Sequence, residues 1–262
     1  MYLSMINRAV ALAKRGEVKG DVCEFGVFQA GGFCVIGRLL KEYGMYDDRH
    51  MFGFDTFAGM PETEVVSGDF MDHEWAAGVF GNTSLEAVEA RVKAAGLKAT
   101  FIKGKFDPSV PLSDYGIDKI ALAHIDCDIY EGYRDALKWI TPHLQVGSVI
   151  LCDESEPPPD PRYFFGVRAH GQRALHDWWT ENDIALFHVK SVWTIALYVV
   201  VDKDYLTKHA EWIAKELMPD NALESVVHEF RLDKQFNTQE VIERLKAMGN
   251  EIQGMVGRAQ EE

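Results

Sequence analysis

Short apolar segments recur along the first part of the chain, each about as long as a buried strand and each ending in a glycine or an acidic residue. Helical patterns precede them and separate most of them. The apolar segments are 21–26, 51–55, 99–104, 119–126 and 148–153, and the helical patterns are 3–15, 30–43, 84–95 and 130–144. Strands that alternate with helices and are apolar on both faces predict a doubly wound, mostly parallel α/β sheet.

The pattern changes after the fifth segment. A helical pattern at about 166–181 leads into two apolar runs, 184–189 and 193–201, and the short connection between them predicts an antiparallel hairpin at the sheet edge. Together with the earlier segments, these runs predict a Rossmann-like sheet of seven strands. Residues 204–262 carry no strand pattern and are rich in charge. We therefore expect one α/β domain over 1–203 and a helical extension over 204–262.

The charge balance disfavours polyanionic partners. The chain has 27 Lys and Arg residues against 41 Asp and Glu residues, a formal net charge of −14, and so acidic a surface repels nucleic-acid backbones and anionic membranes. The four cysteines lack metal-ligand spacing and three lie in apolar runs, as is typical in a reducing cytoplasm. With no secretory signal pattern and no run of membrane-spanning length, we expect a cytoplasmic protein with neither a nucleic-acid nor a membrane partner.

The segment VCEFGVFQAGGF, residues 22–33, combines a carboxylate with three glycines at the end of the first predicted strand. Ligands of open parallel sheets lie beyond the carboxyl ends of the strands, where glycines let the backbone turn and approach a ligand. Glu24, Gly26 and Gly31 are therefore candidate cofactor residues. Asp55, which ends the second strand, is placed to accept hydrogen bonds from ribose hydroxyls.

The identity of such a cofactor follows from what the turn lacks. It has no GxGxxG pattern, the signature of a pyrophosphate-binding site, which favours S-adenosylmethionine over NAD. The alternative is that the glycines only form a turn and that Asp55 is a solvated acid at a strand end.

Acidic residues also end the fourth and fifth predicted strands, at Asp126 and at Asp153-Glu154. If these strands are neighbours, about 4.8 Å apart, the three carboxylates converge beside the cofactor turn. Unpaired carboxylates so close raise one another's pKa, whereas a hard divalent cation takes oxygen ligands readily. The pattern predicts a Mg²⁺ or Mn²⁺ site. The alternative is that Asp153 or Glu154 is a loop acid or the cap of a turn.

Other polar residues near these strands have more ordinary interpretations. Asp128 directly precedes a helical pattern and Glu131 stands three residues later, a spacing that predicts a capping box with Asp128 as N-cap. His124 lies two residues before Asp126, where a core or supporting histidine is expected. His170 is a candidate catalytic base.

No regular pattern covers residues 56–83, and a structureless segment of that length in a compact domain predicts a lid. Its residues His73, Trp75 and Phe80 offer ring surfaces for stacking on a sugar. Alternatively, the segment is a structural loop whose aromatic residues pack on the core. Lys105 is expected at the surface.

Five motifs occur in an order and at separations that resemble the macrocin O-methyltransferase family (TylF/MycF type). They are CEFGVFQAGG, FGFDTFAGMPE, GKFDPSVP, LAHIDCDIYEGYRDAL and VGSVILCDES, and the resemblance covers roughly residues 1–200. It implies a class I methyltransferase sheet with a reversed C-terminal hairpin. It also implies metal-dependent methylation of sugar hydroxyls with S-adenosylmethionine as the methyl donor.

The resemblance further implies roles for particular residues. Those that match the cofactor motif are Glu24, Gly26, Gly31 and Asp55, and those that match the metal-binding positions are Asp126, Asp153 and Glu154. Asp126 is also a candidate to take the acceptor proton. Ala30 stands where the family usually has glycine and Glu154 where it usually has aspartate, and the loop after Glu154 differs from the family pattern. These departures concern the acceptor more than the chemistry.

We therefore expect an S-adenosylmethionine- and divalent-metal-dependent O-methyltransferase that acts on a sugar of a small-molecule acceptor, and a homo-oligomer. One alternative is the same chemistry on a catechol or another small vicinal diol. A second is a noncatalytic Rossmann-type binding protein, against which the three carboxylates argue. A hydride-transferring enzyme would require NAD, whereas a methyltransferase requires binding of S-adenosylhomocysteine.

Overall fold

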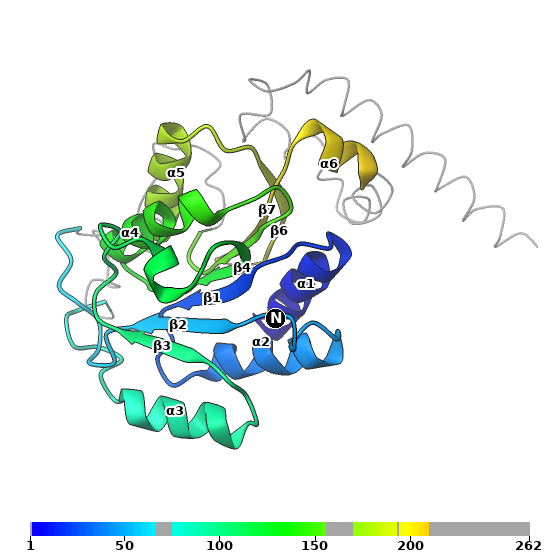
Figure 1. Ribbon diagram of the computed structural model, residues 1–262. Helices are drawn as coiled ribbons and strands as arrows, with labels where there is room; N and C mark the ends of the chain where they lie inside the picture. The colour runs from blue at the N-terminus through cyan, green and yellow to red at the C-terminus, as the bar shows by residue number, and fades with distance from the viewer. Residues whose placement is uncertain (1, 66–74, 156–169, 193, 210–262) are drawn as a thin grey trace, which may run out of the picture.

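The alternating segments form the predicted sheet in a computed structural model, which describes residues 2–65, 75–155, 170–192 and 194–209 (Figure 1). The strands are β1 (Asp21–Phe25), β2 (Met51–Asp55), β3 (Thr100–Lys103), β4 (Ile120–Ile125), β5 (Val149–Cys152), β6 (Leu186–Val192) and β7 (Ile195–Val200). The helices are α1 (Tyr2–Arg15), α2 (Gly31–Glu42), α3 (Leu85–Ala94), α4 (Tyr130–Ile140), α5 (Gly171–Glu181) and α6 (Lys203–Lys208), with short 3₁₀ helices η2 (Leu112–Tyr115) and η3 (Thr141–His143).

The strand order is β3-β2-β1-β4-β5-β7-β6. Strands β1 to β5 are mutually parallel, whereas β7 runs antiparallel to β5 and β6 antiparallel to β7. The predicted α/β fold class, the seven strands and the antiparallel hairpin are thus confirmed. The strand order reverses between β1 and β4, and in open α/β sheets ligands bind at such a switch point.

Local sequence signals explain where several helices begin and end. The hydroxyl of Ser84 accepts the backbone N–H of Ala87 at 3.2 Å and caps α3. Helix α4 ends at Ile140, earlier than predicted, and continues as η3, because Pro142 cannot extend an α-helix. Helix α5 begins at Gly171, while the start predicted near residue 166 lies outside the described residues.

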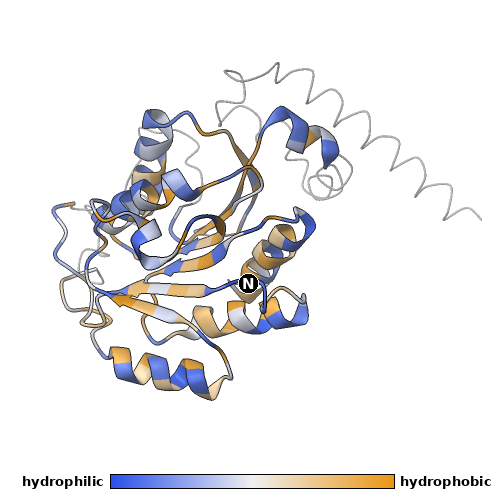
Figure 2. Ribbon diagram, in the orientation of Figure 1, coloured by the Kyte–Doolittle hydropathy of each residue, from blue (hydrophilic) through white to orange (hydrophobic). Residues whose placement is uncertain are grey.

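The sheet separates two hydrophobic layers because side chains alternate along each strand. Val22 and Leu122 pack with α1, α2 and α3, whereas Cys23 and Ala123 pack with α4 and α5. Figure 2 shows the apolar strands between helices that have polar outer faces. By the same alternation, Glu24 on β1 and its register partner His124 on β4 lie on the α1 and α2 side.

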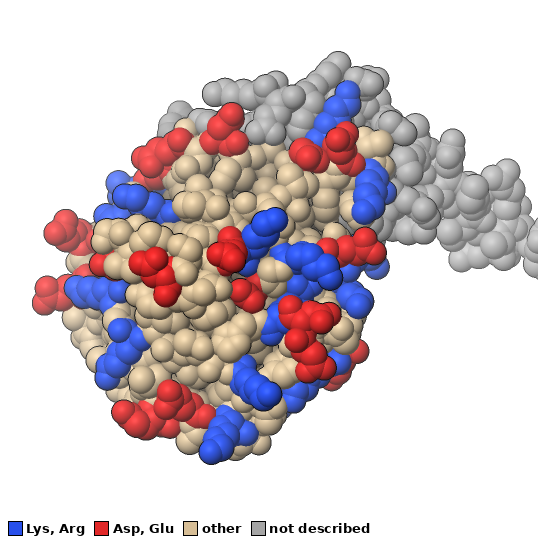
Figure 3. All heavy atoms as spheres, in the orientation of Figure 1, with Lys and Arg blue, Asp and Glu red and all other residues tan. Residues whose placement is uncertain are grey.

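Acidic and basic side chains are interspersed on the face drawn in Figure 3. Within the described ranges, no helix combines the length and the apolar character needed to cross a bilayer.

The predicted extension begins inside the core. In α6, Tyr205 and Leu206 are buried and belong to the same hydrophobic layer as α1. Residues 210–262, including the helix expected at 238–255, lie outside the described residues. The domain boundary at residue 203 therefore stays a prediction.

Candidate active site

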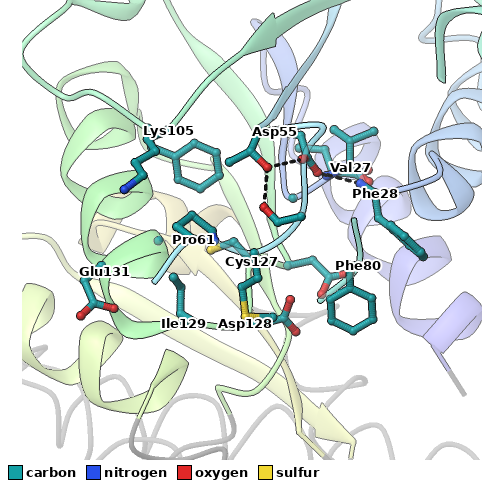
Figure 4. A pocket seen from close by; sticks show the side chains of 18 of the residues that line it. Val27, Phe28, Asp55, Pro61, Phe80, Lys105, Cys127, Asp128, Ile129 and Glu131 are labelled. Carbon is teal, nitrogen blue, oxygen red and sulfur yellow. Dashed lines mark hydrogen bonds between the residues drawn. The ribbon is translucent and has the colours of Figure 1, made fainter. Parts of the chain in front are cut away.

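A cavity of about 470 Å³ opens at the carboxyl ends of β1, β2 and β4, beside the switch point of the sheet (Figure 4). The predicted site residues that line it are Glu24, Gly26, Gly31, Asp55 and Asp126. Five of the predicted residues therefore line one cavity, at the edge of the sheet where ligands of open parallel sheets bind.

The glycines of the β1–α2 turn have different structural reasons. Gly26 has φ +89°, and a Cβ atom there would lie 1.8 Å from the carbonyl oxygen of Asp126. Gly31, the first residue of α2, would place a Cβ where no atom lies within 4 Å, so glycine here leaves room in the cavity. Ala30 adopts a left-handed backbone with φ 59°, a conformation unfavourable for a residue with a side chain.

Asp55 connects the end of β2 to the β1–α2 turn. Its Oδ2 accepts the backbone N–H groups of Val27 and Phe28, both at 2.8 Å, and its Oδ1 accepts that of Phe57 at 2.7 Å. Asp55 therefore fixes the turn, and its predicted bonds to ribose hydroxyls stay a prediction.

Glu24 is a buried carboxylate on the wall of the cavity, with 2% of its surface exposed. It accepts the backbone N–H of Phe33 at the start of α2, and its Oε2 lies 3.4 Å from Nδ1 of the fully buried His124. Burial raises the pKa of Glu24, against the opposing effect of His124. His124 occupies the supporting position expected for it.

Three carboxylates converge where β4 and β5 end. Asp126, Asp128 and Glu154 each offer one oxygen, and these oxygens all lie within 4.8 Å of one another. Glu154 has φ 41° and Asp128 has φ 61°, so two of the three sit on left-handed backbone. Such conformations are unfavourable for residues with a side chain and concentrate at functional sites.

Burial and like charges determine the electrostatics of this cluster. Burial raises the pKa of Asp126 to about 6, with His124 acting against it and Asp153 adding to it. Burial together with Asp126 and Asp153 raises the pKa of Asp128 to about 7. Burial and the neighbouring carboxylates hold the pKa of Glu154 well above its usual range. The cluster thus favours a bound proton or a cation.

The predicted capping role of Asp128 is wrong. The N-cap of α4 is Ile129, with no side-chain cap, and the left-handed backbone of Asp128 directs its carboxylate into the cluster, where it accepts a hydrogen bond from Trp75. Glu131 accepts hydrogen bonds from Thr63 and Glu64 instead of closing a capping box. The Asp126-x-Asp128 spacing at a strand end is the sequence signal that could have placed Asp128 in the cluster.

Asp153, the remaining predicted metal position, has other partners. Its Oδ1 accepts the backbone N–H of Glu154 and the hydroxyl of Thr194, each at 3.0 Å. Of the predicted trio, the structure therefore groups Asp126 and Glu154, with Asp128 as the third member. The metal-binding roles predicted for Asp126, Asp153 and Glu154 stay predictions.

His170 is not among the described residues that line the cavity. It is 1% exposed, its Nδ1 accepts the backbone N–H of Tyr130 at 3.2 Å, and its ring packs against Trp75 with centroids 5.0 Å apart. Trp75 is itself buried with Met60 and Ile129, as the structural alternative for this segment expects.

The remaining aromatic residues of the expected lid are placed differently. Phe80 is 44% exposed and packs edge-on against Phe28 at the cavity. His73 lies outside the described residues, and the lid stays a prediction.

Sequence reasoning did not find three other residues of the cavity. Lys105 is exposed, as expected, but it also lines the cavity. Arg134 lines it from the second turn of α4, and Tyr2 from the start of α1. Tyr2 lies 124 residues from Asp126, the acid to which it donates a hydrogen bond, so no local pattern indicates it.

Comparison with curated proteins finds O-methyltransferases. The chain is 29% identical over 160 residues to mycinamicin III 3''-O-methyltransferase of Micromonospora griseorubida, covering 58% of this chain and 61% of that one. It is 31% identical over 144 residues to 8-demethyl-8-(2,3-dimethoxy-alpha-L-rhamnosyl)-tetracenomycin-C 4'-O-methyltransferase of Streptomyces olivaceus, covering 52% and 53%. The chain thus spans a little over half the length of these relatives.

Solved structures share the fold. The O-methyltransferase NovP has a TM-score of 0.61 at 22% identity, covering 77% of this chain and 80% of that one. The calicheamicin methyltransferase CalS11 has a TM-score of 0.57 at 21% identity, covering 76% and 77%. The model of the Macrocin-O-methyltransferase (TylF) family matches residues 2–166, which include β1 to β5 and the whole carboxylate cluster. By this match over more than half of its length, the chain belongs to the macrocin O-methyltransferase family.

Proposed function

We propose that this protein transfers a methyl group from S-adenosylmethionine to a sugar hydroxyl of a glycosylated small molecule. The observation that carries the proposal is a single cavity with the Glu24-Gly26-Gly31 turn on one side and acidic residues Asp126 and Asp128 on the other. The name of one relative contains a rhamnosyl group, which supports a sugar as the methylated part.

The carboxylate cluster is suited to a divalent cation. Glu154 has a buried Oε2 without a hydrogen-bond partner, and the oxygens of Asp126, Asp128 and Glu154 are close enough to share one ion. Hard oxygen donors of this kind suit Mg²⁺ or Mn²⁺. A bound cation would orient adjacent hydroxyls of the acceptor and lower the pKa of the hydroxyl that attacks.

The chain's own residues position the cofactor and provide a proton acceptor. Glu24 binds the ammonium group of the cofactor. Because Gly31 has no side chain, the protein backbone at this position can approach the cofactor closely. The acceptor oxygen forms a bond to the methyl carbon as the carbon–sulfur bond breaks, and the acceptor proton passes to Asp126. His170 is a weaker candidate for the base, because its Nδ1 already accepts a backbone N–H and its ring does not line the cavity.

Calorimetry with S-adenosylhomocysteine tests the cofactor. We expect binding to the wild type both with Mg²⁺ and with EDTA, and no heat with NAD. Absence of S-adenosylhomocysteine binding would contradict the proposal. If it binds, an acceptor screen follows, beginning with glycosylated compounds. Methylation of catechols and not of sugars would replace the proposed acceptor class.

The cation is tested separately by titrating Mg²⁺ into Asp128→Ala, Asp153→Ala and the control Asp114→Ala, which alters an exposed acid of η2. We expect the Mg²⁺ heat of the wild type to persist in the control and to disappear in Asp128→Ala. Loss of the Mg²⁺ heat in Asp153→Ala but not in Asp128→Ala would show that Asp153, and not Asp128, is the third ligand. A heat that all variants retain would place the cation elsewhere.

A further inference from the structure

A chain of polar side chains, buried at Glu24 and His124 and partly buried at Tyr2 and Asp126, connects the two sides of the cavity through the first helix. The hydroxyl of Tyr2 donates to Oδ2 of Asp126 at 3.0 Å and lies 3.2 Å from Nε2 of His124. Nδ1 of His124 in turn lies 3.4 Å from Oε2 of Glu24. Glu24 and Asp126, which belong to opposite sides of the cavity, are thus joined by only two intervening side chains.

The number of hydrogens fixes the direction of these contacts. A tyrosine hydroxyl has one proton, and here it is donated to Asp126. The contact with His124 is therefore a donation from Nε2–H to the tyrosine oxygen, and the other ring nitrogen faces Glu24. The order of contacts is Glu24, His124, Tyr2, Asp126.

The fold makes room for this chain in three ways. The register places Glu24 directly beside His124 on neighbouring strands. The alternation of side chains continues from His124 to Asp126, so that both face α1. At Gly32 an added Cβ would lie 2.9 Å from the hydroxyl of Tyr2 and 3.5 Å from both Oε1 of Glu24 and Cε1 of His124. The third glycine of the segment 22–33 thus leaves space for these side chains.

Packing of α1 does not require the hydroxyl. The helix is held to the sheet by an apolar face that includes Met5, Ile6, Ala9 and Val10. A phenylalanine at position 2 would keep the contact of the ring with the His124 ring, whose centroids are 5.9 Å apart. What it would lose is the hydrogen bond that fixes one oxygen of Asp126.

We infer that Tyr2 is a positioning residue, which holds Asp126 in a fixed orientation and, through His124, links it to the cofactor-binding carboxylate Glu24. The inference rests on the proposed function, because it gives Glu24 and Asp126 their roles. If so, a substitution at Tyr2 and one at Asp126 change the affinity for the cofactor through the same contacts. The two changes are therefore not independent.

A double-mutant cycle on the full chain tests this without an acceptor or a metal. The affinity for S-adenosylhomocysteine is measured calorimetrically in EDTA for wild type, Tyr2→Phe, Asp126→Asn and the double variant. We expect Tyr2→Phe to weaken binding about fivefold, the effect of losing one hydrogen bond. The double variant should bind no more weakly than the weaker single variant, because both act through the same contacts.

The matched control is Tyr43→Phe. It removes a hydroxyl that also bonds to α1, donating to Oδ1 of Asn7 at 3.2 Å, but at an exposed site away from the cavity. We expect wild-type affinity for it, and thermal midpoints within a few degrees of wild type for both tyrosine variants.

The outcomes separate the inference from the proposed function. Wild-type affinity in Tyr2→Phe, or strictly additive effects in the cycle, would overturn the positioning role. A marked fall in the thermal midpoint of Tyr2→Phe, with additive effects, would likewise overturn it and leave Tyr2 a packing residue. If neither wild type nor Tyr43→Phe binds S-adenosylhomocysteine, the proposed function fails and the inference fails with it.

Discussion

Where β4 and β5 end, three partly buried acids lie close together, whereas in the β6–β7 hairpin a partly buried base contacts one hydroxyl and one aromatic ring. The acids Asp126, Asp128 and Glu154 have raised pKa values, and burial is the largest cause for each. The base is His188 on β6, which contacts the hydroxyl of Ser191 at 2.7 Å and the ring of Tyr198. Burial lowers its pKa to about 4.

The same physical cause therefore has opposite consequences at the two places. Loss of water disfavours the charged form of any group, so an acid holds its proton more tightly and a base more loosely. Near neutral pH the histidine is uncharged, which is the form that burial in the hairpin favours. Ionisation of the acids, by contrast, destabilises the folded protein, and two of them, Asp128 and Glu154, also have left-handed backbone. Unfavourable interactions are thus concentrated at the candidate site.

The largest expected effect comes from the tight packing of backbone at the site. Gly26→Ala places a Cβ 1.8 Å from the carbonyl oxygen of Asp126 at a residue with φ +89°. We expect a loss of about 4 kcal/mol or more in the free energy of unfolding, measured by urea denaturation. Gly31→Ala is the control, because its Cβ meets no atom within 4 Å and alanine suits a helix. Equal stability of the two variants would contradict this account.

The hairpin should show its own pH dependence. Between pH 6.5 and about 4, His188 is protonated in the unfolded chain but not in the folded one, so the free energy of unfolding falls as the pH falls. The full loss is about 3 kcal/mol, from a shift of roughly 2.5 units. Urea denaturation at pH 7.0, 5.5 and 4.5 measures it, with His188→Phe as the comparison. A variant as sensitive to acid as wild type would show that His188 is not responsible.

The fold was more predictable than the site, and the reason is the range of the interactions. Strand and helix periods are local, so 51–55 and 119–126 could be assigned from their own residues. Strand ends also pointed correctly to Asp126 and Glu154 as neighbours, because parallel strands share one edge.

Two features of the site could not be predicted from local periodicity or from strand ends. Asp128 fits a capping pattern locally, and only the left-handed backbone of the folded chain turns it into the cluster. Tyr2 reaches Asp126 across the whole α1–β4 packing, a contact that depends on the register of β1 and β4 and on the space at Gly32.

The acidic cluster should respond to pH in the direction opposite to the hairpin. The pKa of Asp128 is raised from 3.8 to about 7, so its contribution to stability is present below pH 4 and is lost as the pH rises through 7. In EDTA at pH 8, Asp128→Asn should therefore raise the free energy of unfolding by about 2 kcal/mol, and the gain should shrink at pH 5. The control Asp114→Asn should change little at either pH. A variant less stable than wild type at pH 8 would show that the charges are compensated within the protein.

The smallest effect on stability is expected where the loop after β2 crosses the cavity. Glu131, on the first turn of α4, accepts the hydroxyl of Thr63 at 2.7 Å and the backbone N–H of Glu64 at 2.9 Å. Although burial acts in the opposite direction, these hydrogen bonds keep the pKa of Glu131 below its usual value. Both oxygens of one carboxylate thus hold the segment that places Met60, Pro61 and Glu62 on the cavity wall.

Glu131→Gln keeps the length of the side chain but accepts at only one of its two terminal atoms, so one of the two bonds is lost. Because the site is partly exposed, the free energy of unfolding should fall by less than about 1 kcal/mol. Cleavage by glutamyl endopeptidase after Glu62 or Glu64, followed by mass spectrometry, should nevertheless become severalfold faster, since proteolysis follows local opening. Glu89→Gln, on the exposed face of α3, is the control. Unchanged cleavage would mean that this loop is held by its apolar contacts, as the hairpin is, and not by the acid.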